Sequence, residues 1–250
     1  MKNIKIYGML QKMGRVTSPK RVFFHREVAR RIEGRIGERL MEIYRRLYGR
    51  FGPQGWWPAD GPFEVIVGAI LTQNTAWRNV ERAIENLKGE GLLDPWALLK
   101  VDEEELAALI RPAGYYNVKS KRLKAFIRYF CEKYQGDLGK MFGRPLPQLR
   151  EELLKVGGIG PETADSILLY AGGRPVFVVD AYTRRVLGRH RIIGEGATYQ
   201  EVQELFMENL PQDVELFKEY HALFVRLGKT YCRPKPLCEG CPLEDERALS

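Results

Sequence analysis

The stretch that decides the fold is LKVGGIGPETADSILLYAGGRPVFVVD, residues 154–180. Gly157, Gly158 and Gly160 permit the positive φ angles and close backbone approach that a tight turn needs. Pro161 then stands where the first position of a helix would be. Apolar residues recur at helical spacing after the turn, at Ala164, Ile167, Leu168 and Ala171. The pattern predicts a helix, a tight hairpin and a second helix.

The tip of this hairpin is expected to bind an anion. Val156 and Ile159 would anchor the turn, leaving bare backbone N–H groups exposed at a helix N-terminus. Such a terminus attracts phosphate, because its N–H groups and its dipole both favour negative charge. A grip through backbone atoms alone positions DNA without reading its bases.

The stretch LLKVGGIGPETADSILLY, followed by VVDAYTRRVL, resembles the helix–hairpin–helix, Gly/Pro-rich loop and aspartate signature of the endonuclease III superfamily of DNA glycosylases. The resemblance runs from about Leu47 to the C-terminal cysteines. It implies an all-α, two-lobed fold with a six-helix central lobe and a DNA groove between the lobes. The residues it implies at the DNA backbone are Gly158, Gly160, Glu162, Thr163 and Lys119. Lys121, Arg122 and Lys124 are expected to add charge for phosphates.

One position in this signature separates two chemistries. Bifunctional members of the superfamily carry a lysine at the start of the second hairpin helix, which attacks the sugar and leads to strand cleavage. Glu162 stands at that position here, and a carboxylate cannot form an imine. The resemblance therefore implies a monofunctional glycosylase, in which Asp180 stabilises the oxocarbenium-like sugar and orients or deprotonates the attacking water. The structural alternative for Asp180 is an N-cap of the helix that follows.

Aromatic residues upstream narrow the resemblance to one branch. The segments WWP and FEVIVGAILTQNTAW, with Glu162, are similar to the 3-methyladenine DNA glycosylases built on the endonuclease III scaffold. This similarity implies a flipped base sandwiched between Trp56 and Trp77, in a pocket that Trp57 and Pro58 also line. A lid over the core is the alternative for the paired tryptophans.

The superfamily resemblance implies that Gln73 fills the gap left in the duplex when a nucleotide is flipped out, with a turn-stabilising amide as the structural alternative. An alkylated purine is positively charged, and electron-rich rings attract it by ~1–2 kcal/mol each. The expected substrate is therefore a 3-methyladenine-like base in damaged double-stranded DNA. Two alternatives stay open: a bifunctional glycosylase and abasic-site lyase for oxidised pyrimidines, and a DNA lesion binder without catalysis.

The C-terminal segment holds Cys232, Cys238 and Cys241 in a C-x5-C-x2-C pattern, which favours a metal or cluster site over a disulfide. Superfamily members end in a C-x6-C-x2-C-x5-C loop that binds a [4Fe–4S] cluster. Arg247 stands where the fourth cysteine should be. The resemblance implies either a cluster with a non-cysteine ligand or a lost cluster, and zinc is a further alternative. His190 and His221 lack a second ligand nearby in sequence, so no metal role is expected for them.

Composition agrees with a basic globular protein. A net charge of +8 and a pI near 9.3 suit a polyanionic partner. The longest apolar run, VIVGAIL, is far shorter than the ~20 residues of a membrane span. We expect a cytoplasmic, DNA-associated monomer. The predicted divisions are a basic N-terminal extension at 1–36, a central lobe at 55–173, a flanking helical lobe at 37–54 and 174–231, and a cysteine-rich loop at 232–250.

Overall fold

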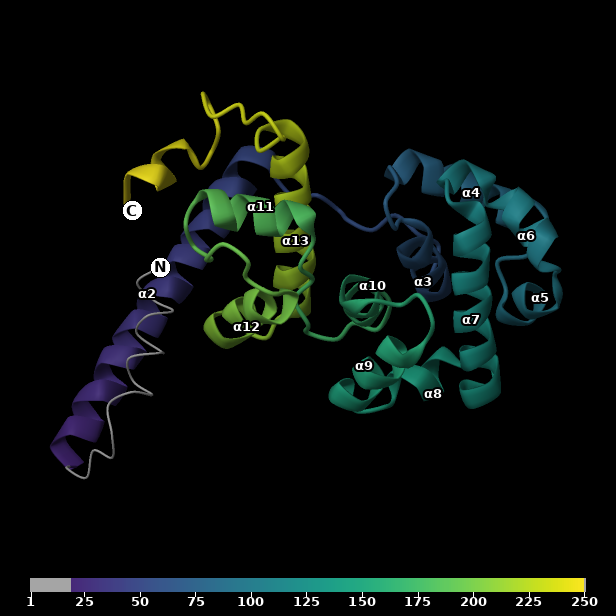
Figure 1. The fold of residues 1–250 in the computed structure, drawn as a ribbon, viewed down its shortest axis with the longest axis horizontal. Helices are drawn as coiled ribbons and strands as arrows, with labels where there is room; N and C mark the ends of the chain where they lie inside the picture. Colours follow the sequence, from purple (N-terminus) through teal and green to yellow (C-terminus); the bar gives the residue numbers. More distant parts are fainter. Residues whose placement is uncertain (1–18, 250) are drawn as a thin grey trace. The chain divides into compact units, whose positions relative to one another are not determined.

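The computed structural model describes the backbone of residues 19–249 and the side chains of residues 34–246. Every regular element in this described part is helical, which confirms the predicted all-α class (Figure 1). The chain divides into two compact units: Gly55–Val178 forms one, and the segments up to Gln54 and from Val179 onward form the other. None of the described helices combines the length and the apolar character needed to cross a membrane.

The unit Gly55–Val178 contains more helices than the six predicted. They are α3 (Pro62–Leu71), α4 (Trp77–Gly89), α5 (Pro95–Lys100), α6 (Glu103–Leu109), α7 (Tyr116–Tyr134), α8 (Leu138–Phe142), α9 (Leu146–Lys155) and α10 (Pro161–Ser166), with the 3-10 turn η1 (Arg111–Ala113) and the π-helical turn η2 (Ile167–Ala171). The additional helices are short and begin at their own caps. Asp94, for example, accepts hydrogen bonds from Trp96 N and Ala97 N at the start of α5.

The core of this unit is built around α3, which is apolar on all sides. Its residues from Val65 to Leu71 are all buried, as expected for a central helix. Helices α4 and α7 and the turn η2 pack against it. The helix ends at Leu71, so the turn that carries Gln73 leaves directly from the most buried part of the unit.

The other unit consists of α2 (Pro19–Phe51), α11 (Ala181–Arg189), α12 (Tyr199–Asn209), α13 (Val214–Thr230) and the 3-10 turn η3 (Glu244–Leu249). Helix α13 packs against α2 and α11, and its Tyr220 is fully buried. The Tyr220 ring stacks on Phe224 at 4.7 Å, and its hydroxyl donates to Leu40 O at 2.7 Å. One helix spans Pro19–Phe51, so the predicted boundary at residue 36 does not interrupt it; residues 1–18 lie outside the described part.

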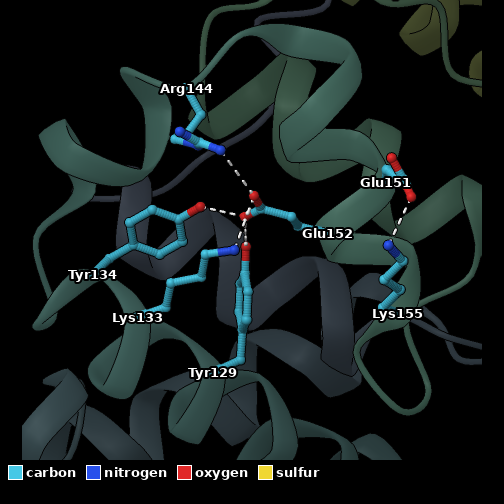
Figure 2. A network of polar contacts seen from close by, with 7 residues as sticks. All are labelled: Tyr129, Lys133, Tyr134, Arg144, Glu151, Glu152 and Lys155. Carbon is cyan, nitrogen blue, oxygen red and sulfur yellow. Dashed lines mark hydrogen bonds and ion pairs between the residues drawn. The ribbon is translucent and has the colours of Figure 1, made fainter.

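In the unit Gly55–Val178, a network of polar contacts joins α7 to α9 (Figure 2). The carboxylate of Glu152 on α9 accepts hydrogen bonds from Tyr129 and Tyr134 on α7, and pairs with Lys133 at 2.9 Å and Arg144 at 3.4 Å. Burial alone would raise the pKa of Glu152, but the hydrogen bonds from Tyr134, Lys133 and Tyr129 outweigh it and lower the pKa to about 2. The carboxylate is therefore ionised at neutral pH.

Replacing Glu152 with glutamine should lower the free energy of unfolding at neutral pH by about 1–3 kcal/mol, because the buried tyrosine hydroxyls lose a charged acceptor. A carboxyl group whose pKa is lower in the folded state stabilises the fold above its unfolded pKa and loses this contribution as the pH falls. The difference in the free energy of unfolding between the unmodified protein and Glu152→Gln should therefore be complete above pH 4.5 and shrink toward pH 2. Chemical denaturation across this range measures it.

Glu151→Gln is the matched control, because Glu151 is one residue away but 68% exposed and pairs with Lys155 on the helix surface (Figure 2). Exposed pairs of this kind contribute less than about 0.5 kcal/mol. Equal losses in the two variants, or a Glu152→Gln deficit that persists at low pH, would show that the network does not stabilise the fold as argued.

Candidate functional site

The predicted hairpin is confirmed. Helix α9 ends at Lys155, α10 begins at Pro161, and the intervening turn is anchored by Val156 and Ile159, which are 8% and 4% exposed. Arg150 on α9 donates to both carboxylate oxygens of Asp165 on α10, at 2.7 and 2.9 Å. This bidentate pair clamps the two helices together, so the glycines at the tip are presented on a rigid base.

Gln73 is bound to this hairpin. Its Nε2 donates to Gly158 O at 3.1 Å and to Thr163 Oγ1 at 3.0 Å, and its Oε1 accepts a hydrogen bond from Arg122. The Arg122 side chain lies across Gly158, because a Cβ added there would stand 2.2 Å from Arg122 Cγ. Gly158 also has a φ of +87°, a conformation that favours glycine. In the protein alone, Gln73 therefore acts as the hairpin-stabilising amide; its role in filling a duplex gap stays a prediction.

Two of the lysines expected to contact DNA are buried instead, which corrects the prediction for Lys119 and Lys124. The Lys119 ammonium group donates to Leu71 O at 2.8 Å and Ala113 O at 2.7 Å, at the last residues of α3 and η1. Lys124 likewise bonds to carbonyl groups at the end of α5, those of Leu98, Leu99 and Val101. Helix C-termini have unpaired carbonyls with partial negative charge, and each lysine satisfies such a group.

Burial and the nearby charge of Arg122 lower the pKa of Lys119 to about 8. Its side chain is 1% exposed, so its ammonium group is out of reach of a phosphate. Of the four basic residues singled out in this segment, Lys121 is exposed and Arg122 is partly exposed. These two remain available for a DNA backbone, and Arg122 lies directly over the hairpin tip.

The predicted pocket residues Trp56, Trp57 and Trp77 form one aromatic cluster, with Trp57 at its centre. Its ring centroid lies 6.4 Å from that of Trp56, 5.2 Å from that of Trp77 and 5.3 Å from that of Tyr170. The indole planes meet at 77° and 84°, so Trp57 makes edge-to-face contacts with its two tryptophan neighbours. Tyr170, on η2, was missed because nothing in its local sequence indicates that it points toward the tryptophans.

Gly68 on α3 allows the rings to pack closely, since a Cβ there would lie 3.2 Å from Trp57 Nε1. A second feature of the cluster favours a ligand site. The indole N–H groups of Trp57 and Trp77 are buried, and no acceptor in the described part of the chain bonds to them. Buried donors without a partner are uncommon in folded proteins, and a bound molecule carrying acceptor atoms would satisfy them. Pro58, the fourth predicted pocket residue, is exposed in the same loop.

Asp180 is the N-cap of α11, which is the structural role that the sequence also allowed for this residue. Its Oδ1 accepts a hydrogen bond from Thr183 N at 2.7 Å, and the residue is 7% exposed. Its Oδ2 lies 3.6 Å from Nε2 of His221 on α13. Burial would raise the pKa of Asp180, but His221 and the Thr183 N–H outweigh this effect, so the pKa is lower than normal. No local sequence pattern indicates this contact of His221, because it joins residues on separate helices.

Cys232, Cys238 and Cys241 line one cavity, together with His190 and Glu244. In the described part of the chain, however, no three His, Cys, Asp or Glu side chains form a group that could hold a metal ion. The donor set therefore does not fit a four-thiolate cluster, and the side chain of Arg247 lies outside the described residues. The iron–sulfur cluster stays a prediction that the iron content and absorbance of the purified protein would decide.

Comparison with known proteins agrees with this geometry. The family described as HhH-GPD superfamily base excision DNA repair protein matches residues 67–212, more than half of the chain. The chain belongs to this superfamily. The matched residues include the aromatic residue Trp77, the hairpin and Asp180.

Individual relatives of this HhH-GPD protein are similar over most of its length. A protein of Methanocaldococcus jannaschii, provisionally named a DNA repair glycosylase, is 52% identical over 210 residues, covering 83% of this chain and 95% of the relative. Endonuclease III of Thermotoga maritima is 32% identical, with 82% and 91% covered. A crystal structure of the H. pylori 3-methyladenine DNA glycosylase bound to 1,N6-ethenoadenine superposes with a TM-score of 0.66 and 28% identity, covering 79% and 97%. The HhH-GPD chain is thus a DNA glycosylase of the base excision repair family.

Replacing Gly158 with alanine in this HhH-GPD protein should weaken binding to duplex DNA by on the order of tenfold. The new Cβ would collide with Arg122, and the left-handed backbone costs a non-glycine residue roughly 1–2 kcal/mol, which corresponds to about that factor. Fluorescence anisotropy with a labelled duplex measures the affinity.

Gly157→Ala is the control, because an added Cβ there meets no atom within 4 Å and the φ angle is not positive. It should bind DNA as the unmodified protein does. If both variants kept full affinity, the tip at Gly158 would not be part of the DNA contact.

Proposed function

We propose that this protein is a monofunctional DNA N-glycosylase that removes alkylated purines, such as 3-methyladenine, from double-stranded DNA. The observation that carries the proposal is the buried Asp180 carboxylate, whose oxygens face the Thr183 N–H and the His221 imidazole, an environment that lowers its pKa. A fixed negative charge of this kind stabilises the positive charge that develops on the sugar as the base departs. It also accepts a proton from the water molecule that attacks the sugar.

The cap geometry defines which carboxylate oxygen does this work. Oδ1 of Asp180 accepts a hydrogen bond from Thr183 N, so the chemistry would fall to Oδ2, which faces His221 at 3.6 Å and keeps a further lone pair for the water. Because the cap holds the carboxylate in one rotamer, no reorganisation of the charge is needed during the reaction. The reaction breaks the bond between the sugar and the base; the base leaves with the bonding electrons, and the water oxygen takes its place.

The aromatic cluster supports an alkylated purine as the substrate. The rings of Trp56, Trp57, Trp77 and Tyr170 offer electron-rich surface to a cationic base, worth ~1–2 kcal/mol per ring. A methylated purine leaves readily without acid catalysis, so a site formed by aromatic rings would need few polar side chains. The related H. pylori 3-methyladenine DNA glycosylase, with its bound ethenoadenine, supports the same class of base.

The hairpin would hold the DNA strand. We propose that Gly158, Gly160, Glu162 and Thr163 contact a phosphate through their backbone N–H groups, since the Thr163 side chain is buried and accepts a hydrogen bond from Gln73. Glu162 is exposed at the start of α10, where a lysine nucleophile would stand in a bifunctional enzyme. Gln73 would leave the hairpin to fill the duplex gap when the base is flipped out.

Asp180→Asn should abolish most base release while preserving DNA binding. Asparagine is a good N-cap and its amide oxygen can still accept from Thr183 N, so α11 should remain intact. Loss of the charge should slow release by a factor on the order of 10²–10⁴. Methylated duplex DNA is incubated with each protein, and the freed bases are identified by chromatography. Undiminished release by the variant would contradict the role of Asp180, and release of no base by the unmodified protein would contradict the proposed function.

Sodium borohydride should trap no covalent adduct between this protein and DNA that carries the damaged base or an abasic site. Trapping requires a Schiff base, which an exposed glutamate at position 162 cannot form and which the buried Lys119 and Lys124 cannot reach. A bifunctional endonuclease III treated in parallel serves as the positive control. Because endonuclease III of T. maritima is 32% identical to this chain, a trapped adduct would instead favour a bifunctional glycosylase and lyase.

A further inference from the structure

His221 lies in the middle of α13, with 7% of its surface exposed, and faces the carboxylate of Asp180. The 3.6 Å between His221 Nε2 and Asp180 Oδ2 is an ion-pair distance, slightly longer than a hydrogen bond. Both residues belong to the same compact unit, in which α13 packs directly against α11. Hydrogen bonds at catalytic groups are often long in the free enzyme and shorten when the substrate is bound.

Asp180 needs such a partner. Removing a carboxylate from water costs several kcal/mol, and this cost is offset only when its oxygens find hydrogen bonds or an opposite charge. The Thr183 N–H satisfies Oδ1. Oδ2 faces the imidazole at 3.6 Å, so His221 is the side chain that the structure places against the second oxygen.

Four charged groups on α13 and on the helices packed against it have recorded partners other than Asp180. Arg184 on α11 donates to Ala197 O, and Arg185 donates to Cys232 O at 2.7 Å. On α2, Arg50 donates to the Tyr231 hydroxyl. Glu219, two residues before His221, accepts a hydrogen bond from Gln54 N at 2.8 Å. The contacts that the structure records at the Asp180 carboxylate therefore come from Thr183 and His221.

We infer that His221 is a positioning residue for the proposed base-release reaction: its Nε2–H holds Oδ2 of Asp180 and keeps this carboxylate ionised and correctly oriented. The inference rests on the proposed function for its catalytic consequence. The pairing between the two side chains is a property of the folded protein alone and can be measured without any substrate.

The first test is a titration of the Asp180 carboxyl group by carbon-detected NMR in the full-length protein. In His221→Gln and His221→Ala, the carboxyl group should titrate at higher pH than in the unmodified protein, because burial raises its pKa once the imidazole is gone. Tyr220→Phe is the control: it removes a buried hydroxyl from the neighbouring position of α13 without touching Asp180, and should leave the titration unchanged. A titration that is the same in all four proteins would overturn the inference.

The second test is single-turnover base release as a function of pH. His221→Ala should be slower on the order of tenfold to a hundredfold, since misplacing a reacting group by about 1 Å has an effect of that size. The acidic limb of its pH–rate profile, where the rate falls as Asp180 takes up a proton, should also move to higher pH. His221→Gln keeps an N–H donor near the position of Nε2 and should recover part of the rate. If His221 only packs the core, replacing it would change stability but leave the acidic limb in place. This result would refute the positioning role.

The two tests separate the possible failures. If the unmodified protein releases no base but the titration of Asp180 responds to His221, the proposed function fails while the pairing stands. If base release is normal and neither the titration nor the pH profile responds to His221, the function stands and the inference fails.

Discussion

A carboxylate can remain charged inside a protein only if its oxygens are paired, and the candidate active site depends on how this is achieved at Asp180. One oxygen caps α11 and the other faces the imidazole of His221 on α13. Because the two partners come from different helices, the charge is stable only when α11 and α13 are packed together. The packing of α11 against α13 therefore also brings together the groups that surround the proposed catalytic carboxylate.

The same principle organises the other unit, where buried charges pair with helix ends. Lys119 bonds to carbonyls at the ends of α3 and η1, and Lys124 to carbonyls at the end of α5. These lysines join α7 to the helices around it, while Lys121 on the same helix is exposed and Arg122 is partly exposed. Arg122 in turn covers Gly158 and binds Gln73, so the hairpin tip, the cationic side chain and the proposed gap-filling residue form one connected structure.

The cysteine-rich segment is also held by side-chain donors that bond to backbone carbonyls, here in a loop. Arg189 on α11 donates to Arg233 O at 2.6 Å, to Pro234 O at 2.8 Å and to the Cys232 sulfur at 3.2 Å. Two neighbouring arginines, Arg185 and Arg189, thus hold the start of this segment against the helix that Asp180 caps. A guanidinium group can do this because its several N–H donors lie in one plane and can bond to more than one backbone carbonyl.

What the sequence determined by itself was the local structure: the helical class, the hairpin at 156–160, the cap at Asp180 and the apolar character of α3. These features depend on residues a few positions apart, whose spacing and backbone preferences can be read directly. Only the tertiary structure decided that Lys119 is buried, that Trp57 contacts both Trp56 and Trp77, that Gln73 is bound to the hairpin and that His221 faces Asp180. Each of these contacts joins residues that are distant along the chain, and their proximity is set by how whole helices pack, which the spacing of residues within one helix does not specify.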